Sequence, residues 1–488
     1  KDVVGTRCRG GEHDRMQDKA PIIRLLLYSQ KLVEAGLKRG EPFHFEEGTP
    51  SMFDEFFTLA DELGVFEGIA SLEDPRKRAY IPLPVIAATV LCRFLYGLES
   101  FRCTGRVLLR NHVLLQRLGV APEVLEKGGY YQCQRAGDGG DPESAPKLFD
   151  EESIADVLAR VDVAGLNALL SRFVQQLRKR QPRWFKRGLF IMDSNHFALK
   201  GSRRQYKWCC LMLWTPYGMI PVAAVFSATE GEGTGETSVG RQLLERVFET
   251  YGERGFVKLL LMDTGYQDGA MLRWLYDEHG VDWVMDPSEE LIATKGMLAA
   301  IDEKPQRPWV RVQPPKLELP KEQMPVRHVM WLGERHNFYT YGRPVNGCVV
   351  RDTYPPSEKH PQGHVRYFCL LTSRMDWKGA QIHDTSRMRW CIEDTFGLMT
   401  NFWGLGRWEI GRFEVYRATI LLMALTFGLL VVYQWEKQLR LPLKRIQERL
   451  AVQSQWRVLV VCAGAVVSAT PAMLNSWIQK GWLRGVPG

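Results

Sequence analysis

Several kinds of sequence feature are missing from this chain of 488 residues. Neither low-complexity tracts nor internal repeats are visible, and 45% of the residues are hydrophobic while 25% are charged. This is the composition of a folded globular protein. The length exceeds what one ordinary hydrophobic core needs, so we expect two to four domains.

Cysteine patterns that would indicate a zinc site are also missing. The ten cysteines are scattered, no CxxC pair occurs, and no Cys/His spacing suits zinc. No secretory signal is evident either. A reducing, intracellular compartment fits this pattern best.

A convincing membrane-spanning run is absent as well. The longest apolar run, "ATILLMALTFGLLVVY" at residues 418–433, has sixteen residues. A membrane helix needs roughly 18–20. We therefore interpret the run as a buried helix and expect no membrane partner.

The chain carries a formal net charge of +8, and its basic residues cluster. Residues 178–188 contain six Lys or Arg with two aromatic residues between them, and residues 199–207 contain four more. Each run could be a solvated linker or could contact nucleic-acid phosphates. In the second run, the candidate phosphate contacts are Lys200, Arg203 and Arg204.

The hydrophobic pattern divides the chain into regions. Apolar residues recur at helical spacing over residues 20–180, which predicts an all-helical N-terminal domain at 1–180. From residue 188 the order is three strands, helix, strand, helix, strand, which is typical of an α/β fold. Residues 288–375 are rich in proline and alternating segments, so we expect a β-rich insertion there. The helical pattern returns at residue 384 and predicts a helical C-terminal region at 435–488.

Two aspartates follow buried strands of the α/β region. Asp193 is predicted to end the first strand and Asp263 the fourth, with a helix crossing between them. Such a crossover favours a parallel arrangement, often with the strands adjacent. Neighbouring strand ends lie about 5 Å apart. Both carboxylates should then lie at the edge of the sheet where α/β proteins bind ligands.

A later stretch, "RMRWCIEDTF" at residues 387–396, adds a third carboxylate. On a helix, Arg389 and Glu393 share one narrow arc beside an apolar stripe. Alone, this is an ordinary ion pair worth a few tenths of a kcal/mol. Together with Asp193 and Asp263, Glu393 would complete a set of three carboxylates that suits Mg²⁺ or Mn²⁺. Two such ions support in-line phosphoryl displacement.

Three segments carry a resemblance to a known family. They are "LFIMDSNHF", "LLLMDTGYQDG" and "RMRWCIEDTFGLMTNFWGLG". Their order and spacing resemble those of DDE transposases of bacterial insertion sequences, in the cut-and-paste group. That group carries Tyr, Arg, Glu and Lys at fixed spacing on the last helix. Arg389 and Glu393 match, whereas Ser386 and Thr400 stand at the Tyr and Lys positions.

The resemblance implies a fold and a chemistry. It implies an RNase H-like catalytic domain over residues 186–434, a mixed sheet flanked by helices and interrupted by the β-rich insertion. It implies that Asp193, Asp263 and Glu393 hold two metal ions and that Arg389 contacts phosphate. The implied partners are double-stranded DNA with inverted-repeat ends, target DNA and a second copy of the chain. The implied location is the cytoplasm of a bacterium or archaeon, at the nucleoid.

The resemblance also implies that the insertion supplies an aromatic ring to a distorted DNA end. Trp331 is our candidate, because "VRHVMWLGERHNF" is predicted to be a strand entering a Gly-containing turn. A core tryptophan of a small sheet is the alternative. For the whole protein, the alternatives are an RNase H-like nuclease without strand transfer and a catalytically inert, transposase-derived DNA-binding protein. The intact acidic triad argues against the second.

Overall fold

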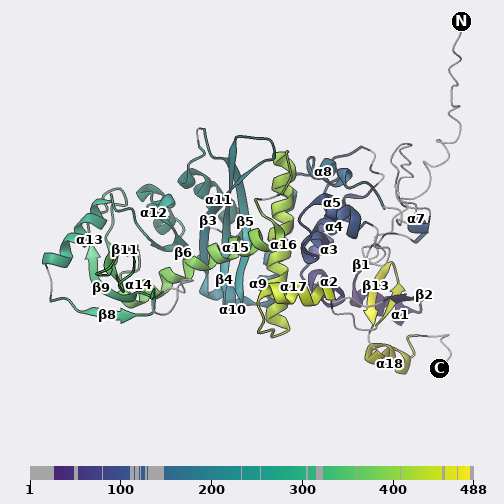
Figure 1. Cartoon of the computed structure of the whole chain (residues 1–488). Coiled ribbons are helices and arrows are strands. Elements are labelled where there is room, and N and C mark those ends of the chain that lie inside the picture. The colour runs from purple at the N-terminus through teal and green to yellow at the C-terminus, as the bar shows by residue number, and fades with distance from the viewer. Residues whose placement is uncertain are drawn as a thin grey trace, which may run out of the picture.

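The structure is a computed structural model that describes residues 27–48, 53–77, 79, 81–109, 115, 120, 122–126, 129, 148–231, 233–252, 254–303, 306–314, 323–358, 360–406, 408–452, 457–469 and 471–483. Its largest element is a nine-stranded sheet in the order β5-β4-β3-β6-β7-β11-β10-β9-β8 (Figure 1). The strands are β3 (Leu189–Ala198), β4 (Gln205–Thr215), β5 (Gly218–Ala228), β6 (Leu259–Met262), β7 (Asp282–Met285), β8 (Trp309–Val312), β9 (Val326–Arg335), β10 (Val345–Tyr354) and β11 (His364–Thr372).

The first five of these strands form the predicted α/β core. β3, β4 and β5 make an antiparallel meander, and β6 and β7 run parallel to β3. β6 lies directly beside β3, with Ile191 opposite Leu261. The predicted mixed sheet, and the predicted adjacency of the two aspartate strands, are therefore confirmed.

Helices connect and cover the core strands. α11 (Glu236–Tyr251) joins β5 to β6, and α12 (Gly269–Asp277) joins β6 to β7. α16 (Phe413–Glu436) packs on β5 and on helices from the N-terminal region (Figure 1). By length and composition α16 could cross a membrane, but 94% of its most apolar window is buried within the protein. The predicted buried helix is confirmed. α16 begins before the apolar run at residues 418–433 and ends after it.

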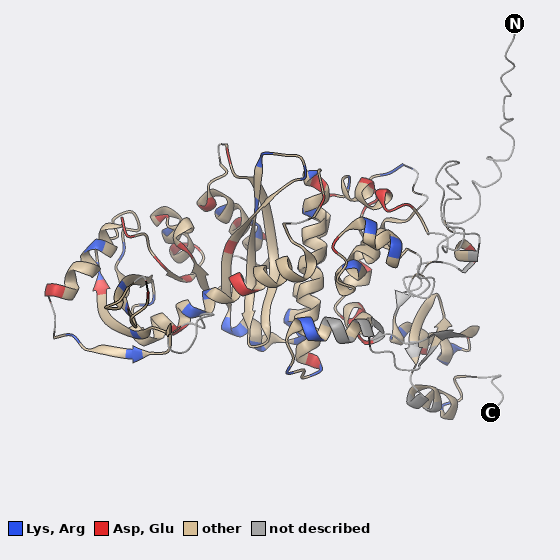
Figure 2. Cartoon of the chain, viewed as in Figure 1, with Lys and Arg blue, Asp and Glu red and all other residues tan. Residues whose placement is uncertain are grey.

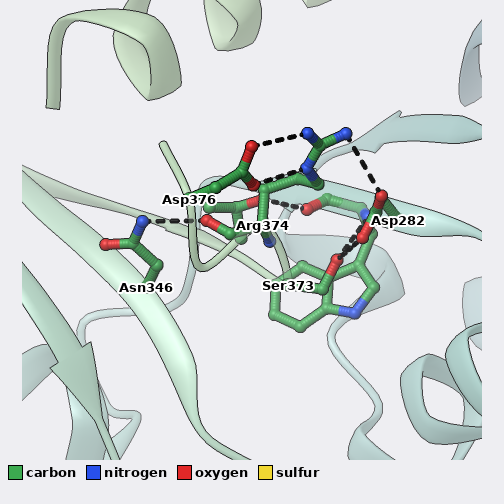
Figure 3. Close-up of polar contacts among 7 residues, drawn as sticks. Asp282, Asn346, Ser373, Arg374 and Asp376 are labelled. Atoms are coloured by element: carbon green, nitrogen blue, oxygen red, sulfur yellow. Dashed lines mark hydrogen bonds and ion pairs between the residues drawn. The ribbon is translucent and has the colours of Figure 1, made fainter. Parts of the chain in front are cut away.

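The insertion extends the core sheet instead of forming a separate one. It contributes α13 (Ile292–Glu303) and strands β8 to β11, and β11 pairs antiparallel with β7. Polar side chains fix this junction (Figure 3): the Ser373 hydroxyl donates to Asp282, and Arg374 forms ion pairs with Asp282 and Asp376. α14 (Gly379–Ser386) then returns the chain along β9, β10 and β11 to α15 (Trp390–Trp403).

The two ends of the chain build a second sheet that the sequence analysis missed. Its order is β1-β13-β12-β2, from β1 (Leu27–Tyr28), β2 (Phe43–Gly48), β12 (Arg457–Cys462) and β13 (Ala465–Ala469). The predictions of an all-helical N-terminal domain and a helical C-terminal region are therefore wrong. β12 is rich in β-branched residues, but its partner β2 lies some four hundred positions earlier in the chain, so no local pattern reveals the pairing.

Helices make up most of the remaining described structure. α16 packs on α2, α4, α8 and α9, which joins the N-terminal helices to the nine-stranded sheet. The helices of the two terminal regions are α1 (Gln30–Arg39), α2 (Phe53–Glu62), α3 (Val65–Ala70), α4 (Leu83–Leu95), α5 (Phe101–Val107), α7 (Pro122–Glu126), α8 (Glu152–Leu158), α9 (Val163–Arg180), α10 (Pro182–Arg187), α17 (Leu443–Val452) and α18 (Pro471–Gln479).

Candidate active site

The first carboxylate lies inside a strand. β3 continues past Asp193 to Ala198 and pairs with β4, so the prediction that Asp193 ends its strand is wrong. What ends there is the fully buried part of β3, at Met192, because β6 stops pairing with β3 just before that point. Asp193 therefore emerges where the neighbouring strand has ended, and its Oδ1 accepts the N–H of Ser194 at 2.7 Å.

The second carboxylate is held by a tight turn. Asp263 follows β6 and caps a 3₁₀ turn at Thr264–Tyr266, where its Oδ1 accepts the N–H of Gly265 at 3.0 Å. The buried Tyr266 hydroxyl hydrogen-bonds Ser194 Oγ at 2.6 Å, which ties this turn to β3. The residues after the two aspartates are thus linked, and the carboxylates are held in neighbouring positions.

The third carboxylate comes from the predicted helix. Arg389 ends a 3₁₀ turn and Glu393 lies in the first turn of α15. The Arg389 guanidinium lies 2.8 Å from Glu393 Oε1 and 3.7 Å from Asp193 Oδ2, and its side chain is only 14% exposed. The pair is therefore more than an ordinary surface helix pair, because it also reaches the strand that carries Asp193.

The electrostatics of Asp193 reflect this gathering of acids. Burial first, and the nearby Asp263 and Glu393 second, raise the pKa of the Asp193 carboxyl to about 7, although the Ser194 N–H and Arg389 act to lower it. Neighbouring negative charges disfavour ionisation of a carboxyl in this way. A cation that binds between the carboxylates reduces their repulsion.

Two further acids lie near this site that the sequence analysis did not assign to it. Asp286 directly follows β7, at the strand end beside Asp263, and burial raises the pKa of Asp286 to about 6. Glu236 opens α11, and its carboxylate occupies the space over Gly265 that a side chain there would fill. Asp286 had a readable signal, since it follows a buried strand as Asp263 does. Glu236 had none.

The donor set fits a hard divalent cation, because every donor is a carboxylate oxygen. Within the described part of the chain, no three His, Cys, Asp or Glu side chains converge as metal ligands. Arg389 contacts both Asp193 and Glu393, and so fills the space that separates them. A bound cation would have to replace these contacts with its own.

The predicted phosphate contacts lie on the turn between β3 and β4. Lys200, Arg203 and Arg204 are all exposed there. Lys200 pairs with the exposed Glu409 at 2.9 Å, and the Arg204 guanidinium lies over the Tyr206 ring. This turn follows the end of β3, and Asp193 lies earlier on the same strand. The cations therefore lie toward the same end of β3 as the carboxylates.

Trp331 is not brought to the carboxylates. It lies within β9, which runs on through Gly333 to Arg335, so the predicted turn is wrong. A bulge shifts the register between β9 and β10 next to Gly333, and Gly333 itself pairs with Gly347 within the strand. The ring is 37% exposed, its Nε1 donates to Asn346 at 2.9 Å, and the Lys378 ammonium lies 3.9 Å from its centroid.

Another tryptophan, within residues 387–396, does lie beside the site. Trp390 is 48% exposed, and the Arg389 guanidinium lies 5.4 Å from its ring centroid. The sequence analysis assigned Trp390 no role, although it lies between Arg389 and Glu393 in the same stretch.

Comparison with protein families gives a match over residues 184–428 to the family model described as "Transposase DDE domain". This segment covers half of the chain and contains all three carboxylates. A search among curated proteins gives no significant match.

Proposed function

Because the chain belongs to the DDE transposase family, we propose that it binds the ends of an insertion sequence and catalyses strand cleavage and strand transfer there. Membership makes the protein a transposase of the metal-dependent, DNA-cleaving kind, with DNA as its substrate. The particular residues, partners and steps below are our proposal.

Asp193, Asp263 and Glu393 would hold two Mg²⁺ ions, or Mn²⁺, which when bound supply charge stabilisation for phosphoryl transfer. Arg389 would donate charge-assisted hydrogen bonds to the scissile phosphate. Water would add to the phosphorus as the 3′ oxygen leaves. The freed 3′-OH would then attack the opposite strand or target DNA, with no covalent protein intermediate.

Other parts of the chain would hold the DNA. Lys200, Arg203 and Arg204 would contact the backbone, and Trp331 remains the predicted stacking residue of the insertion. The N-terminal helices would read the end sequence, partly by helix-in-groove contacts. We expect a homodimer to bring two ends together, in the cytoplasm at the nucleoid.

One observation carries the proposal: Arg389 contacts Asp193 and Glu393 at once, so residues some two hundred positions apart meet at one sheet edge. The same observation argues against an inert, transposase-derived DNA-binding protein, because such a protein has no need to keep the acids together. An RNase H-like nuclease without strand transfer would share this geometry, so only the reaction products separate it from a transposase.

The test is cleavage of a labelled transposon end by Asp193→Asn, Asp263→Asn and Glu393→Gln. Each should abolish cleavage and leave end binding nearly intact, because the carboxylates serve the metal and the cations serve the DNA. Asp394→Asn is the matched control, since Asp394 follows Glu393 on the helix but is exposed. Cleavage above about one per cent of wild type removes that residue from the triad. Cleavage without a joined product identifies the nuclease alternative.

A further inference from the structure

A row of side chains crosses the four strands of the insertion on one side of the sheet. Arg311 of β8 lies opposite His328 of β9, which lies opposite Arg351 of β10, which lies opposite Tyr367 of β11. Directly opposed residues point to the same side of a sheet. These four residues, here called the outer row, therefore share one face.

The outer row is open to solvent. Arg311 is exposed, and so is Tyr367, which is 38% exposed. His328 and Arg351 are half-buried. α13 packs on β10 and β11 farther along the sheet, where the Cys369 thiol donates to the Thr294 carbonyl. The helix thus covers the neighbouring part of this face and leaves the outer row free.

The outer row faces away from the catalytic helices. Residues alternate between faces along a strand, so Arg327 and Val329 of β9 point opposite to His328. On that other side α14 packs against β9, and a side chain at Gly379 would meet Val329. α14 leads directly into the turn that carries Arg389. The outer row and α14 therefore lie on opposite faces of the strands of the insertion.

The cations of the outer row lack acidic partners. No ion pair involves Arg311 or Arg351 in the described part of the chain, and the Arg351 guanidinium instead lies 4.3 Å from the Trp309 ring centroid. Arg351 Nε and His328 Nδ1 are buried without a hydrogen-bond partner there. The pKa of His328 is lowered by burial and by Arg351 and Arg311, so the two arginines disfavour a positive charge on the ring between them.

We propose that the outer row binds the phosphate backbone of a second DNA segment, distinct from the segment held for cleavage. The proposal rests on the transposase function proposed above. Strands are spaced about 4.8 Å apart, so Arg311 and Arg351 lie about 10 Å apart and can meet phosphates of one duplex. Exposed Val326 and Val365 flank the row and would contact sugars. Figure 2 shows one basic residue, in blue, on β8, the last strand of the sheet.

The experiment measures DNA affinity of the full chain as a function of salt. Duplex binding by Arg311→Ala/Arg351→Ala is followed by fluorescence anisotropy, with the catalytic residues intact. Each lost phosphate contact lowers the slope of log Kd against log salt by about 0.9, so the double variant should lose about two. Arg311→Lys/Arg351→Lys should restore most of the slope.

A matched control separates this effect from loss of charge in general. Lys295→Ala/Arg343→Ala removes the same charge from the same region, but Lys295 pairs with Glu290 and Arg343 with Asp277. Its slope should stay near that of wild type. Equal slopes for the two double variants overturn the proposal. So does a changed sedimentation profile of the outer-row variant with an unchanged slope, which would indicate a second copy of the chain as the partner.

The outcome is separable from that of the proposed function. If wild type fails to cleave or join DNA, the proposed function fails whatever the salt slopes are. If wild type cleaves and joins DNA while the outer-row variant keeps the wild-type slope, only the inference about the outer row fails. Melting temperatures of all variants check that the substitutions, including the one at half-buried Arg351, leave the fold intact.

Discussion

Aspartates lie at both ends of the core strands of the nine-stranded sheet, here called its first and second edges, and their neighbours differ. Where β6 and β7 end, Asp263 and Asp286 lie near Asp193, and burial and neighbouring acids raise the pKa of Asp193. Where β7 begins, Asp282 accepts from Ser373 and Arg374, beside a cleft of about 540 Å³ (Figure 3). Acids at the first edge repel one another, and the acid at the second is neutralised. The first edge is the one at which we propose that a cation binds, and the side chains of the second edge hold the insertion in place.

After the three carboxylate variants, the largest change in cleavage is expected for Arg389→Ala. A charge-assisted hydrogen bond to phosphate is worth about 1.5–3 kcal/mol, so cleavage should fall roughly 10- to 100-fold. Arg389→Lys should recover part of this loss. A large drop in melting temperature with unchanged activity per folded molecule would return Arg389 to a purely structural role.

The pH dependence of stability offers the next test. Because the pKa of Asp193 is about 7 in the folded chain and near 3.8 when unfolded, the folded state holds its proton longer. Without divalent metal, the contribution of Asp193 to stability should therefore be fully present below about pH 4 and be lost as pH rises through about 7. Asp286 and Asp61 each have a pKa raised to about 6. Their contributions to stability should likewise be lost, as pH rises through about 6.

Thermal melts of wild type and Asp193→Asn between pH 5 and 8 check this. The variant should lose the decline that wild type shows near pH 7, and Mg²⁺ should stabilise wild type more at pH 8 than at pH 6, because ligands must be deprotonated. Parallel melting curves for the two proteins across this range would show that Asp193 is not perturbed.

A smaller effect on cleavage is expected from replacing two exposed tryptophans, Trp390 on α15 beside the carboxylates and Trp331 on β9 of the insertion. If the stacking ring must lie beside the carboxylates, Trp390→Ala should slow second-strand cleavage about tenfold, since stacking contributes about 1–3 kcal/mol per base. Trp331→Ala should then be nearly silent. A 2-aminopurine label near the DNA end reports the flipped base. Loss of its signal in Trp331→Ala alone would support the residue predicted from the sequence.

The sequence predicted the catalytic core well because that core is built from local patterns. Buried strands followed by aspartates, and a crossover helix between them, were enough to place Asp193 near Asp263. The helix arc placed Arg389 beside Glu393, and the ion pair between them confirms it. These relations depend on strand order and helical period, which short stretches of sequence encode.

The missed features depend on contacts between distant parts of the chain. β2 and β12 pair across the whole length of the protein, so neither segment alone indicated a sheet. Gly333 suggested a turn, but pairing with β10 through a bulge kept it in the strand. Glu236 reaches the site only because Gly265, on another element, lacks a side chain. Periodicity cannot report such packing.

The smallest effect on cleavage, despite a clear loss of stability, is expected for Asn346→Ala at the second edge. Asn346 is fully buried. Its amide donates to the carbonyls of Arg374 and Trp377 at 2.8 and 2.7 Å and accepts from Trp331 Nε1. Losing three hydrogen bonds at about 1 kcal/mol each should lower the free energy of unfolding by about 2–3 kcal/mol.

Cleavage per folded Asn346→Ala molecule should nevertheless stay within about twofold of wild type, because no carboxylate of the first edge depends on this side chain. Urea unfolding measures the stability loss, and cleavage is assayed well below the melting temperature. Asn346→Asp is the sharper variant, since an aspartate keeps the acceptor for Trp331 Nε1 but loses both donors. Second-strand cleavage by this variant could fall while first-strand nicking persists. Such a result would mean that Asn346 positions Trp331 for DNA distortion. The second edge would then serve cleavage as well as stability.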